Sequence, residues 1–248
     1  MKFTKYFSPK LALLMTALAC TTQAQVADFF FKVGGNIVKN ECLLTTAVTA
    51  STRPRVACSS LCLQKVNCHF FCIRNGNGLC ALFKAFVAVR WPGHPASAST
   101  TTYDACYTSW GDPRDIVKTN SHFTYSSVWG SLDPKSATDG YACAAPAFFA
   151  TQSQPNSFTQ IDMELTTRVQ TVIIATTLGS EMANMDVILS NTSDYNLGQK
   201  IGRVDGAPPH WSTCTIVTNT SVAGRYITTF WAATGYHSYA EIQVVPLP

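Results

Sequence analysis

The chain has 248 residues, of which 13% are charged, and a formal net charge of +4. This length is enough for one large domain or two ordinary ones. The basic residues form no block, and a surface that follows nucleic-acid phosphates needs clustered Lys and Arg, so nucleic acid is excluded as a partner. Low charge and many β-branched residues favour β-rich extracellular modules over helical bundles.

Residues 1–24 have the pattern of a secretory signal peptide. A positively charged start precedes an apolar stretch from Leu11 to Cys20, and small residues follow at Thr22 and Ala24. The apolar stretch is too short to cross a bilayer, which needs about 20 residues. An uncleaved membrane anchor is the alternative. We expect cleavage after Ala24 and a secreted, extracellular protein with no transmembrane segment.

Nine cysteines remain after this cleavage, and six of them lie between Cys42 and Cys80. Export exposes thiols to an oxidising compartment, so most should be paired. An odd number leaves at least one thiol free or bonded to a second chain, which predicts a disulfide-linked homodimer as one outcome. Sequons at Asn191 and Asn219 predict glycosylation on the same route.

The cysteine-rich part contains one helix signal and one hairpin signal. Over Val56–Val66, cysteines and apolar residues recur at intervals of three and four, which predicts a helix with its cysteines on one face. Asn75–Gly78 is a turn signal between two apolar runs, His69–Ile73 and Leu79–Val89. We therefore expect a short helix packed on a hairpin and held there by disulfides.

The spacing Cys58-x3-Cys62-x5-Cys68, followed by Cys80, resembles the PAN/apple family. In that family the helix carries two cysteines and the following hairpin carries two more. The resemblance implies an α+β module with nested disulfides, Cys62–Cys68 inside Cys58–Cys80. Each bond closes a short loop and should stabilise the small core by about 2–3 kcal/mol.

The apple-like module covers residues 34–91, or reaches to Cys106. Within it Cys42 pairs either with Cys106, which would tie the ends of the module together, or with Cys72. A zinc site is the alternative interpretation of the cysteine cluster. The gaps of three and five residues and the oxidising route both disfavour zinc, whose cysteine ligands are usually separated by two residues.

The stretch 92–102 contains two prolines and no periodic apolar face, which predicts a linker. Residues 103–248 then show short apolar or alternating runs separated by Gly and Asn, which predicts an all-β sandwich or barrel. The expected strands are Phe158–Leu165, Val169–Ala175, Met185–Leu189, Thr213–Val217, Tyr226–Trp231 and Tyr239–Val245.

Four segments of this second module resemble the discoidin family, which includes the C domains of coagulation factors and the fucolectins. They are, in chain order, Ser136–Gly140, Phe158–Met163, Gly224–Ile227 and Ala240–Val244. The resemblance implies a galactose-binding-domain-like jelly-roll sandwich with binding loops at one end. The whole chain is thus expected to be a disulfide-rich α+β apple module followed by an all-β jelly roll.

The second module departs from the fucolectin pattern. Fucolectins bind fucose with a His and two Arg, but between residues 143 and 191 this chain has no His and only Arg168. The segment where the arginines belong, Thr176–Asn184, contains none, so fucose binding by that mechanism is not expected. The family's cysteine before the closing Glu is also absent. Cys143 would therefore pair with Cys214, or one of the two would be the unpaired thiol.

Some members of the discoidin family also hold a calcium ion, the one candidate cofactor here, and the resemblance implies Asp139 and Glu241 at two of its ligand positions. Calcium takes six to eight oxygen ligands, so two carboxylates are not a sufficient set. The alternative is that Asp139 caps a turn and Glu241 makes a structural hydrogen bond.

Aromatic residues in the loops of the second module are candidate ligand contacts, because their rings stack on sugars or touch membranes. Trp129 is the first choice, and Tyr125, Phe148 and Trp211 are the others.

The sequence lacks the usual catalytic motifs. It has no Gly-x-Ser-x-Gly elbow, no His-Glu-x-x-His and no phosphate loop, and a Cys–His nucleophile would need a reduced thiol. We therefore expect no enzyme but a secreted lectin-like protein that binds glycans or glycoproteins. The alternatives are an extracellular protein-interaction or matrix-adhesion module, and peripheral phospholipid binding through aromatic loops.

Overall fold

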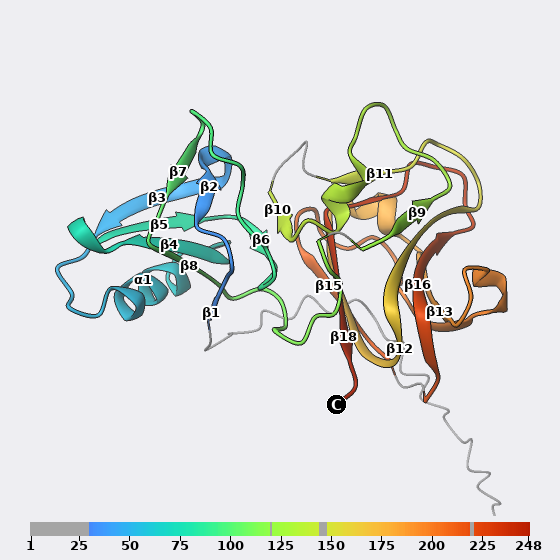
Figure 1. Ribbon diagram of the computed structural model, residues 1–248. Helices are drawn as coiled ribbons and strands as arrows, with labels where there is room; N and C mark the ends of the chain where they lie inside the picture. Colours follow the sequence, from blue (N-terminus) through green and yellow to red (C-terminus); the bar gives the residue numbers. More distant parts are fainter. Residues whose placement is uncertain (1–29, 120, 144–147, 219–220) are drawn as a thin grey trace, which may run out of the picture.

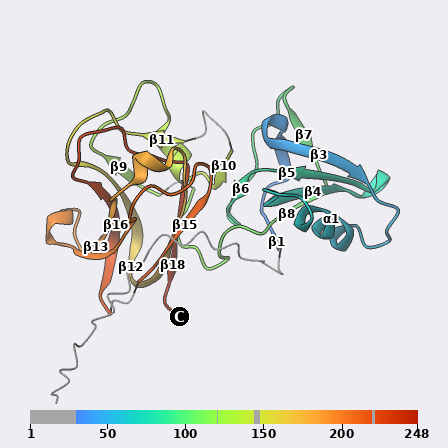
Figure 2. The same ribbon diagram turned by 180° about the vertical axis from the view of Figure 1, so that it is seen from behind.

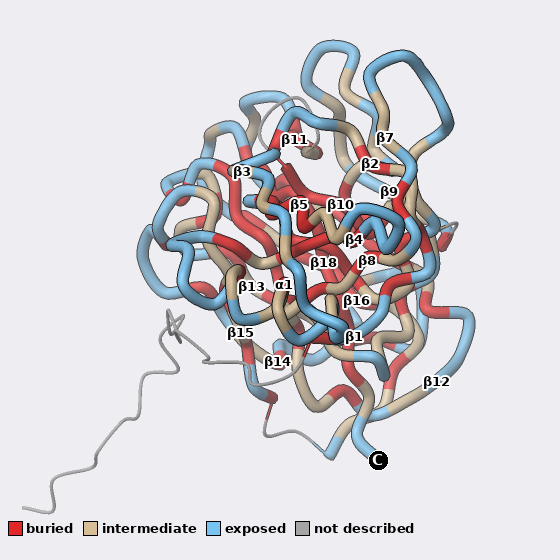
Figure 3. The backbone as a smooth tube through the Cα atoms, turned by 90° about the vertical axis from the view of Figure 1, so that its left-hand side faces the viewer, coloured by how far each residue is buried: buried red, intermediate tan, exposed pale blue. Residues whose placement is uncertain are grey.

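The computed structural model describes residues 30–119, 121–143, 148–218 and 221–248. Two units lie side by side in both views of the ribbon (Figures 1 and 2): a smaller one formed by the first part of the chain and a larger one formed by the rest. In Figure 3 the buried backbone gathers in the interior, and the outer loops are exposed. Within the described residues, no helix is both long and apolar enough to span a membrane.

The first unit is built on a five-stranded antiparallel sheet in the order β1-β8-β4-β5-β3. These strands are β1 (Phe31–Lys32), β3 (Leu43–Val48), β4 (Phe70–Arg74), β5 (Leu79–Phe83) and β8 (Ala105–Thr108). The hairpin β4–β5 turns through η2 (Asn75–Asn77) and Gly78, whose φ of 63° lies in the left-handed region that glycine adopts without strain. This is the turn that the Asn-Gly pattern predicts.

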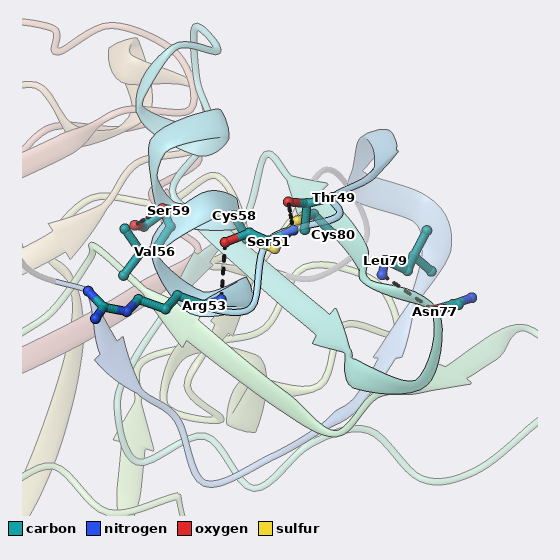
Figure 4. The surroundings of a disulfide bond; sticks show 9 residues. All are labelled: Thr49, Ser51, Arg53, Val56, Cys58, Ser59, Asn77, Leu79 and Cys80. Carbon is teal, nitrogen blue, oxygen red and sulfur yellow. Dashed lines mark hydrogen bonds between the residues drawn. A yellow bond between two sulfur atoms is a disulfide. The ribbon is translucent and has the colours of Figure 1, made fainter.

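Helix α1 (Pro54–Leu63) begins with proline in its first turn, where the missing N–H costs nothing. The prediction placed this helix at Val56–Val66, two residues later at its start and three at its end. Its buried cysteines pack with Phe71 and Leu82 of the sheet. Disulfides Cys58–Cys80 and Cys62–Cys68 join the helix to β5 and to the segment before β4, as Figure 4 shows for the first bond.

The pairing of the other cysteines differs from both expectations for Cys42. Cys72 and Cys106 lie opposite each other on the neighbouring strands β4 and β8 and form a disulfide, so neither is left for Cys42. Cys42 instead bonds to Cys143, 101 residues away in the second unit. The expected Cys143–Cys214 bond is therefore wrong.

Cys214 is also in a disulfide, and no described cysteine is free. The unpaired thiol on which the disulfide-linked homodimer was predicted is thus not found among the residues that the structure describes. The prediction of an unpaired thiol counted nine cysteines, because cleavage after Ala24 would remove Cys20, the tenth.

The segment 92–102, expected to be a linker, folds back into the first unit. It ends in β7 (Thr100–Thr102), which pairs with β2 (Ile37–Lys39) in a small separate sheet. Strand β8 then completes the five-stranded sheet. The chain therefore leaves the first unit only after Thr108, two residues beyond the longer of the two expected ends, Cys106. Paired backbone, and not side-chain periodicity, holds this segment in place.

The second unit is a sandwich organised around the 19-residue strand β12 (Ser157–Ala175). A register shift between Asp162 and Thr167 bends it, so that its first part pairs with β16 and β9 and its second part with β15 and β18. Two predicted strands are thus one bent strand. The other strands are β9 (Phe123–Tyr125), β11 (Phe149–Ala150), β13 (Asp186–Ser190), β14 (Gln199–Arg203), β15 (Thr213–Val217), β16 (Ala223–Trp231), β17 (Ser238–Tyr239) and β18 (Glu241–Pro246).

A continuous apolar core fills the space between the two layers of the second unit, with Ile161, Val172 and Ile174 of β12 among its members. Alternate residues of a strand point to opposite faces, which explains why the alternating segments of the sequence form these strands.

The two units share backbone pairing and a small apolar cluster. β6 (Phe86–Val87) of the first unit pairs with β10 (Tyr141–Ala142) of the second. Phe86 and Ala88 also pack with Trp110 and Ala240. Together with the Cys42–Cys143 bond, these contacts hold the first unit against the sandwich.

Candidate functional site

A pocket of about 580 Å³ opens at one end of the sandwich. Thr177 and Leu178, just after the end of β12, line it. The last residue of β12, Ala175, pairs with Thr213 at the start of β15 and with Glu241 at the start of β18. Loops next to these strand ends supply the walls. The lining includes Trp129, Phe148, Thr177, Leu178, Glu181, Trp211 and Tyr236.

Two half-exposed rings form the outer wall. Trp129 is 48% exposed and Tyr236 is 47% exposed, and their ring centroids lie 6.0 Å apart in an edge-to-face arrangement. The backbone N–H of Trp129 donates to the carbonyl of Ala150 at 2.9 Å, which fixes its loop to β11. Large aromatic rings that stay accessible on a fixed backbone are suited to stacking against a ligand.

Trp211 reaches the pocket on the loop before β15. Its backbone N–H donates to the carbonyl of Thr177 at 3.1 Å. The loop can approach so closely because Gly179, the first residue of η4 (Gly179–Met182), has no side chain. A Cβ at Gly179 would overlap the carbonyl oxygen of Pro208. Trp211 also packs, with Phe148, against the apolar cluster that contains Phe86 of the first unit.

One carboxylate lies among these rings. Glu181, in η4, accepts a hydrogen bond from the hydroxyl of Ser238, which also contacts the hydroxyl of Thr177. His237 lies 3.2 Å from the Glu181 carbonyl through Nδ1 and stacks on Trp231 at 4.8 Å between centroids. Glu181 is therefore held in place by its neighbours.

Within the described part of the chain, no positive side chain is paired with Glu181. It is the only charged residue among the described residues that line the pocket. Glu181 also takes part in no ion pair within the described ranges. The pocket thus combines several aromatic faces with one uncompensated negative charge.

Three of the four aromatic residues chosen from the sequence line this pocket: Trp129, Phe148 and Trp211. Tyr125 does not, because it ends β9 and its ring lies on Phe149, 5.8 Å away between centroids. Sequence reasoning missed Tyr236, whose loop carried no motif.

Sequence reasoning also missed Thr177, Leu178 and Glu181. Their segment did carry a signal, since it was the stretch where fucolectin arginines were expected and where an acid stands instead. That single acidic residue in an otherwise uncharged loop marked the carboxylate of the pocket.

The two carboxylates expected to hold calcium lie together at the boundary between the units. Glu241 is fully buried and accepts N–H donors from Gly140 at 2.6 Å and Ile242 at 3.1 Å. Asp139 accepts the N–H of Tyr141 at 2.8 Å. Both carboxylates therefore accept hydrogen bonds from the local backbone, as in the alternative interpretation.

The positive charge beside Glu241 is the guanidinium of Arg90. Arg90, from the first unit, forms ion pairs with Glu241 and with Asp115, both of which are buried. Burial raises the pKa of Glu241, against the lowering effect of Arg90. The described residues contain no group of three His, Cys, Asp or Glu side chains arranged for a metal ion. The oxygen set at Asp139 and Glu241 does not fit calcium, which needs six to eight oxygen ligands.

Of the two sequons, Asn191 is exposed just after β13. Asn219 lies outside the described residues. Glycosylation at both stays a prediction.

No family model matches the chain, and a search of curated proteins found no match. Among solved structures it is similar to the lectin domain of lectinolysin in complex with Lewis b antigen, with 19% identity and a TM-score of 0.46 over 55% of this chain and 99% of that one. A fucose-binding module of Streptococcus pneumoniae has 21% identity and a TM-score of 0.45 over 54% of this chain and 95% of the other.

A family 32 carbohydrate-binding module from Clostridium perfringens, in complex with galactose, has 14% identity and a TM-score of 0.44 over 53% of this chain and 97% of the module. These neighbours are carbohydrate-binding modules and lectin domains. Each TM-score is below 0.5 and each identity below 25%, so the functional assignment rests on the geometry of this chain.

Proposed function

We propose that this protein is a secreted, non-catalytic lectin-like protein that binds a glycan in the pocket lined by Trp129, Tyr236 and Trp211. The observation that carries the proposal is the combination of accessible aromatic rings with a fixed carboxylate in one concave site. Sugar rings present C–H faces that stack on aromatic side chains, and their hydroxyls donate to carboxylate oxygens. A few polar groups in a mostly apolar pocket are the usual arrangement of a small-molecule site.

Secretion and the identity of the first unit belong to the same proposal. Four described disulfides are typical of proteins exported to an oxidising compartment. The helix on a five-stranded sheet, with one disulfide nested inside another, supports an apple-like module.

The test is a glycan array with the protein secreted from a eukaryotic host. We expect binding to a subset of glycans, and Trp129→Ala should weaken it at least about tenfold because a stacking face is lost. Tyr125→Ala is the matched control, an exposed ring outside the pocket, and should bind like the native protein. A calcium chelator should have no effect. Failure of the native protein to bind any glycan on the array would disprove the proposal.

A second candidate function, binding of an extracellular protein by the first unit, is favoured by one observation. Val56, Leu63 and Val66, on and just after α1, are between 53% and 83% exposed. Grouped exposed apolar side chains often mark interaction surfaces. Pull-down from extracellular fluid with the native protein and with Val56→Ser would test this, with free sugars added. Capture that ignores the substitution, or that free sugars abolish, would count against it.

A further inference from the structure

We infer that the glycan bound in this pocket carries an unacetylated amino sugar, whose ammonium group is held between the aromatic rings and Glu181. This inference rests on the proposed function and specifies the ligand class of the same site. It follows from the charge, the ring placement and the hydrogen-bonding capacity of the pocket.

Among the residues that the structure describes, the charge of the pocket is negative and no cation offsets it. Glu181 is the only charged side chain among its described lining residues, and it is only partly exposed to solvent. Glu181 accepts one hydrogen bond from Ser238, but a charge that has lost part of its hydration and has no counter-charge is still costly. A cationic ligand group would restore the balance, and the attraction is stronger here than in bulk water.

The rings favour the same ligand charge. Aromatic faces are the negative part of the ring quadrupole and attract cations that approach within about 6 Å, with Trp the strongest. Trp129, Tyr236 and Trp211 all line the pocket, as Glu181 does. A neutral sugar would gain stacking from these rings but would leave Glu181 without a counter-charge.

The hydrogen-bonding groups indicate a primary amine. One carboxylate oxygen of Glu181 accepts a hydrogen bond from the Ser238 hydroxyl, so the other oxygen remains available to accept from a ligand. The Thr177 hydroxyl contacts the same Ser238 hydroxyl. A primary ammonium has three N–H donors for such acceptors, whereas a quaternary ammonium has none. The volume of about 580 Å³ also exceeds what a lone headgroup fills and suits one or two sugar rings. Acetylation of the amine would remove the charge on which the recognition depends.

The experiment compares matched oligosaccharides by isothermal titration calorimetry on the full chain. Glucosamine oligomers and N-acetylglucosamine oligomers of equal length are titrated at about pH 6, where an amine is protonated, and at about pH 9. We expect the amine form to bind at least tenfold tighter at the lower pH and to lose that advantage at the higher pH. Equal or tighter binding of the acetylated form would overturn the inference while leaving glycan binding intact.

Glu181→Gln tests the carboxylate directly and keeps an oxygen that can accept from Ser238. It should weaken binding of the amine form at least tenfold and reduce its pH dependence. Glu164→Gln is the matched control, an exposed glutamate on β12 that pairs with Lys118 outside the pocket. If Glu181→Gln unfolds the site, the pair of ligands on the native protein still decides the question.

Two further outcomes separate this inference from the proposed function. If no sugar of either kind binds, the proposed function fails and the inference fails with it. Phosphatidylcholine vesicles are the third ligand, and their binding at the pocket without any binding of amino sugars would overturn the amino-sugar assignment in favour of a lipid headgroup.

Discussion

Asp139 shows how the protein environment alters a single carboxylate. Burial raises its pKa from 3.8 to about 6, against the lowering effects of the Tyr141 N–H and of Arg90. Because the folded state binds this proton more tightly than the unfolded state, protonation stabilises the fold below about pH 4. That contribution is lost as the pH rises through about 6.

Asp139→Asn should remove this pH dependence. We expect the free energy of unfolding of the native protein to fall, relative to the variant, by about 2 kcal/mol between pH 4 and 7. Urea denaturation at several pH values measures the difference, and Asp205→Asn serves as the exposed control. Parallel stability curves for Asp139→Asn and the native protein would show that the shift is absent.

At the scale of elements, the pocket depends on the contact between η4 and the loop that carries Trp211. Gly179→Ala places a methyl group where the carbonyl of Pro208 now lies, so the loop must move. We expect glycan affinity to fall at least about tenfold, since Trp211 shifts with its loop. Gly76→Ala, at a position with open space, is the control and should bind normally. Unchanged affinity in Gly179→Ala would mean that the loop position does not shape the site.

The two disulfides of α1 allow a graded test of the first unit. The Cys58–Cys80 bond spans 22 residues and the Cys62–Cys68 bond spans 6. A longer closed loop restricts the unfolded chain more, so replacing the first pair by alanine should cost about 3 kcal/mol and the second about 2 kcal/mol. Denaturant unfolding under non-reducing conditions gives both values, and the reverse order would contradict this account.

On the scale of the whole molecule, Arg90 joins the two units through charge. It extends from the first unit to two carboxylates of the second, Asp115 at 4% and Glu241 at 0% side-chain exposure, and donates to the Ile242 carbonyl at 3.2 Å. One guanidinium therefore balances two buried acids next to the Cys42–Cys143 bond and the β6–β10 pairing.

Arg90→Ala should lower the free energy of unfolding by about 3–5 kcal/mol, because it leaves buried carboxylates without a cation. Adding Glu241→Gln should recover part of the loss, since one of the stranded charges is then removed. Calorimetry of the two variants and the native protein provides the comparison. A loss under about 1 kcal/mol in Arg90→Ala would show that the ion pairs do not join the units.

Much of the local structure follows from local sequence. The helix, the Asn-Gly hairpin and the strands of the sandwich lie within a few residues of their predicted positions, because periodicity and turn chemistry act over short distances. The disulfides Cys58–Cys80 and Cys62–Cys68 join the pairs that the apple resemblance implied. Trp129 and Trp211 could be chosen as candidate ligand contacts because aromatic rings in loops can stack on a ligand, and both line the pocket.

The remaining features depend on contacts that no local pattern encodes. Cys42 finds Cys143 across 101 residues, and Arg90 meets Glu241 across 151. The predicted linker became paired strand for the same reason, as β7 needs β2 to exist. Tyr236 and Glu181 become a site only when five separate segments of the described chain meet at one end of the sandwich, around residues 129, 148–150, 177–181, 211 and 236. The sequence by itself determined the elements and their short cross-links. The packing of one unit on the other decided the counter-charge at Glu241 and the shape of the pocket. These features depend on long-range contacts, which form only after the elements have stacked.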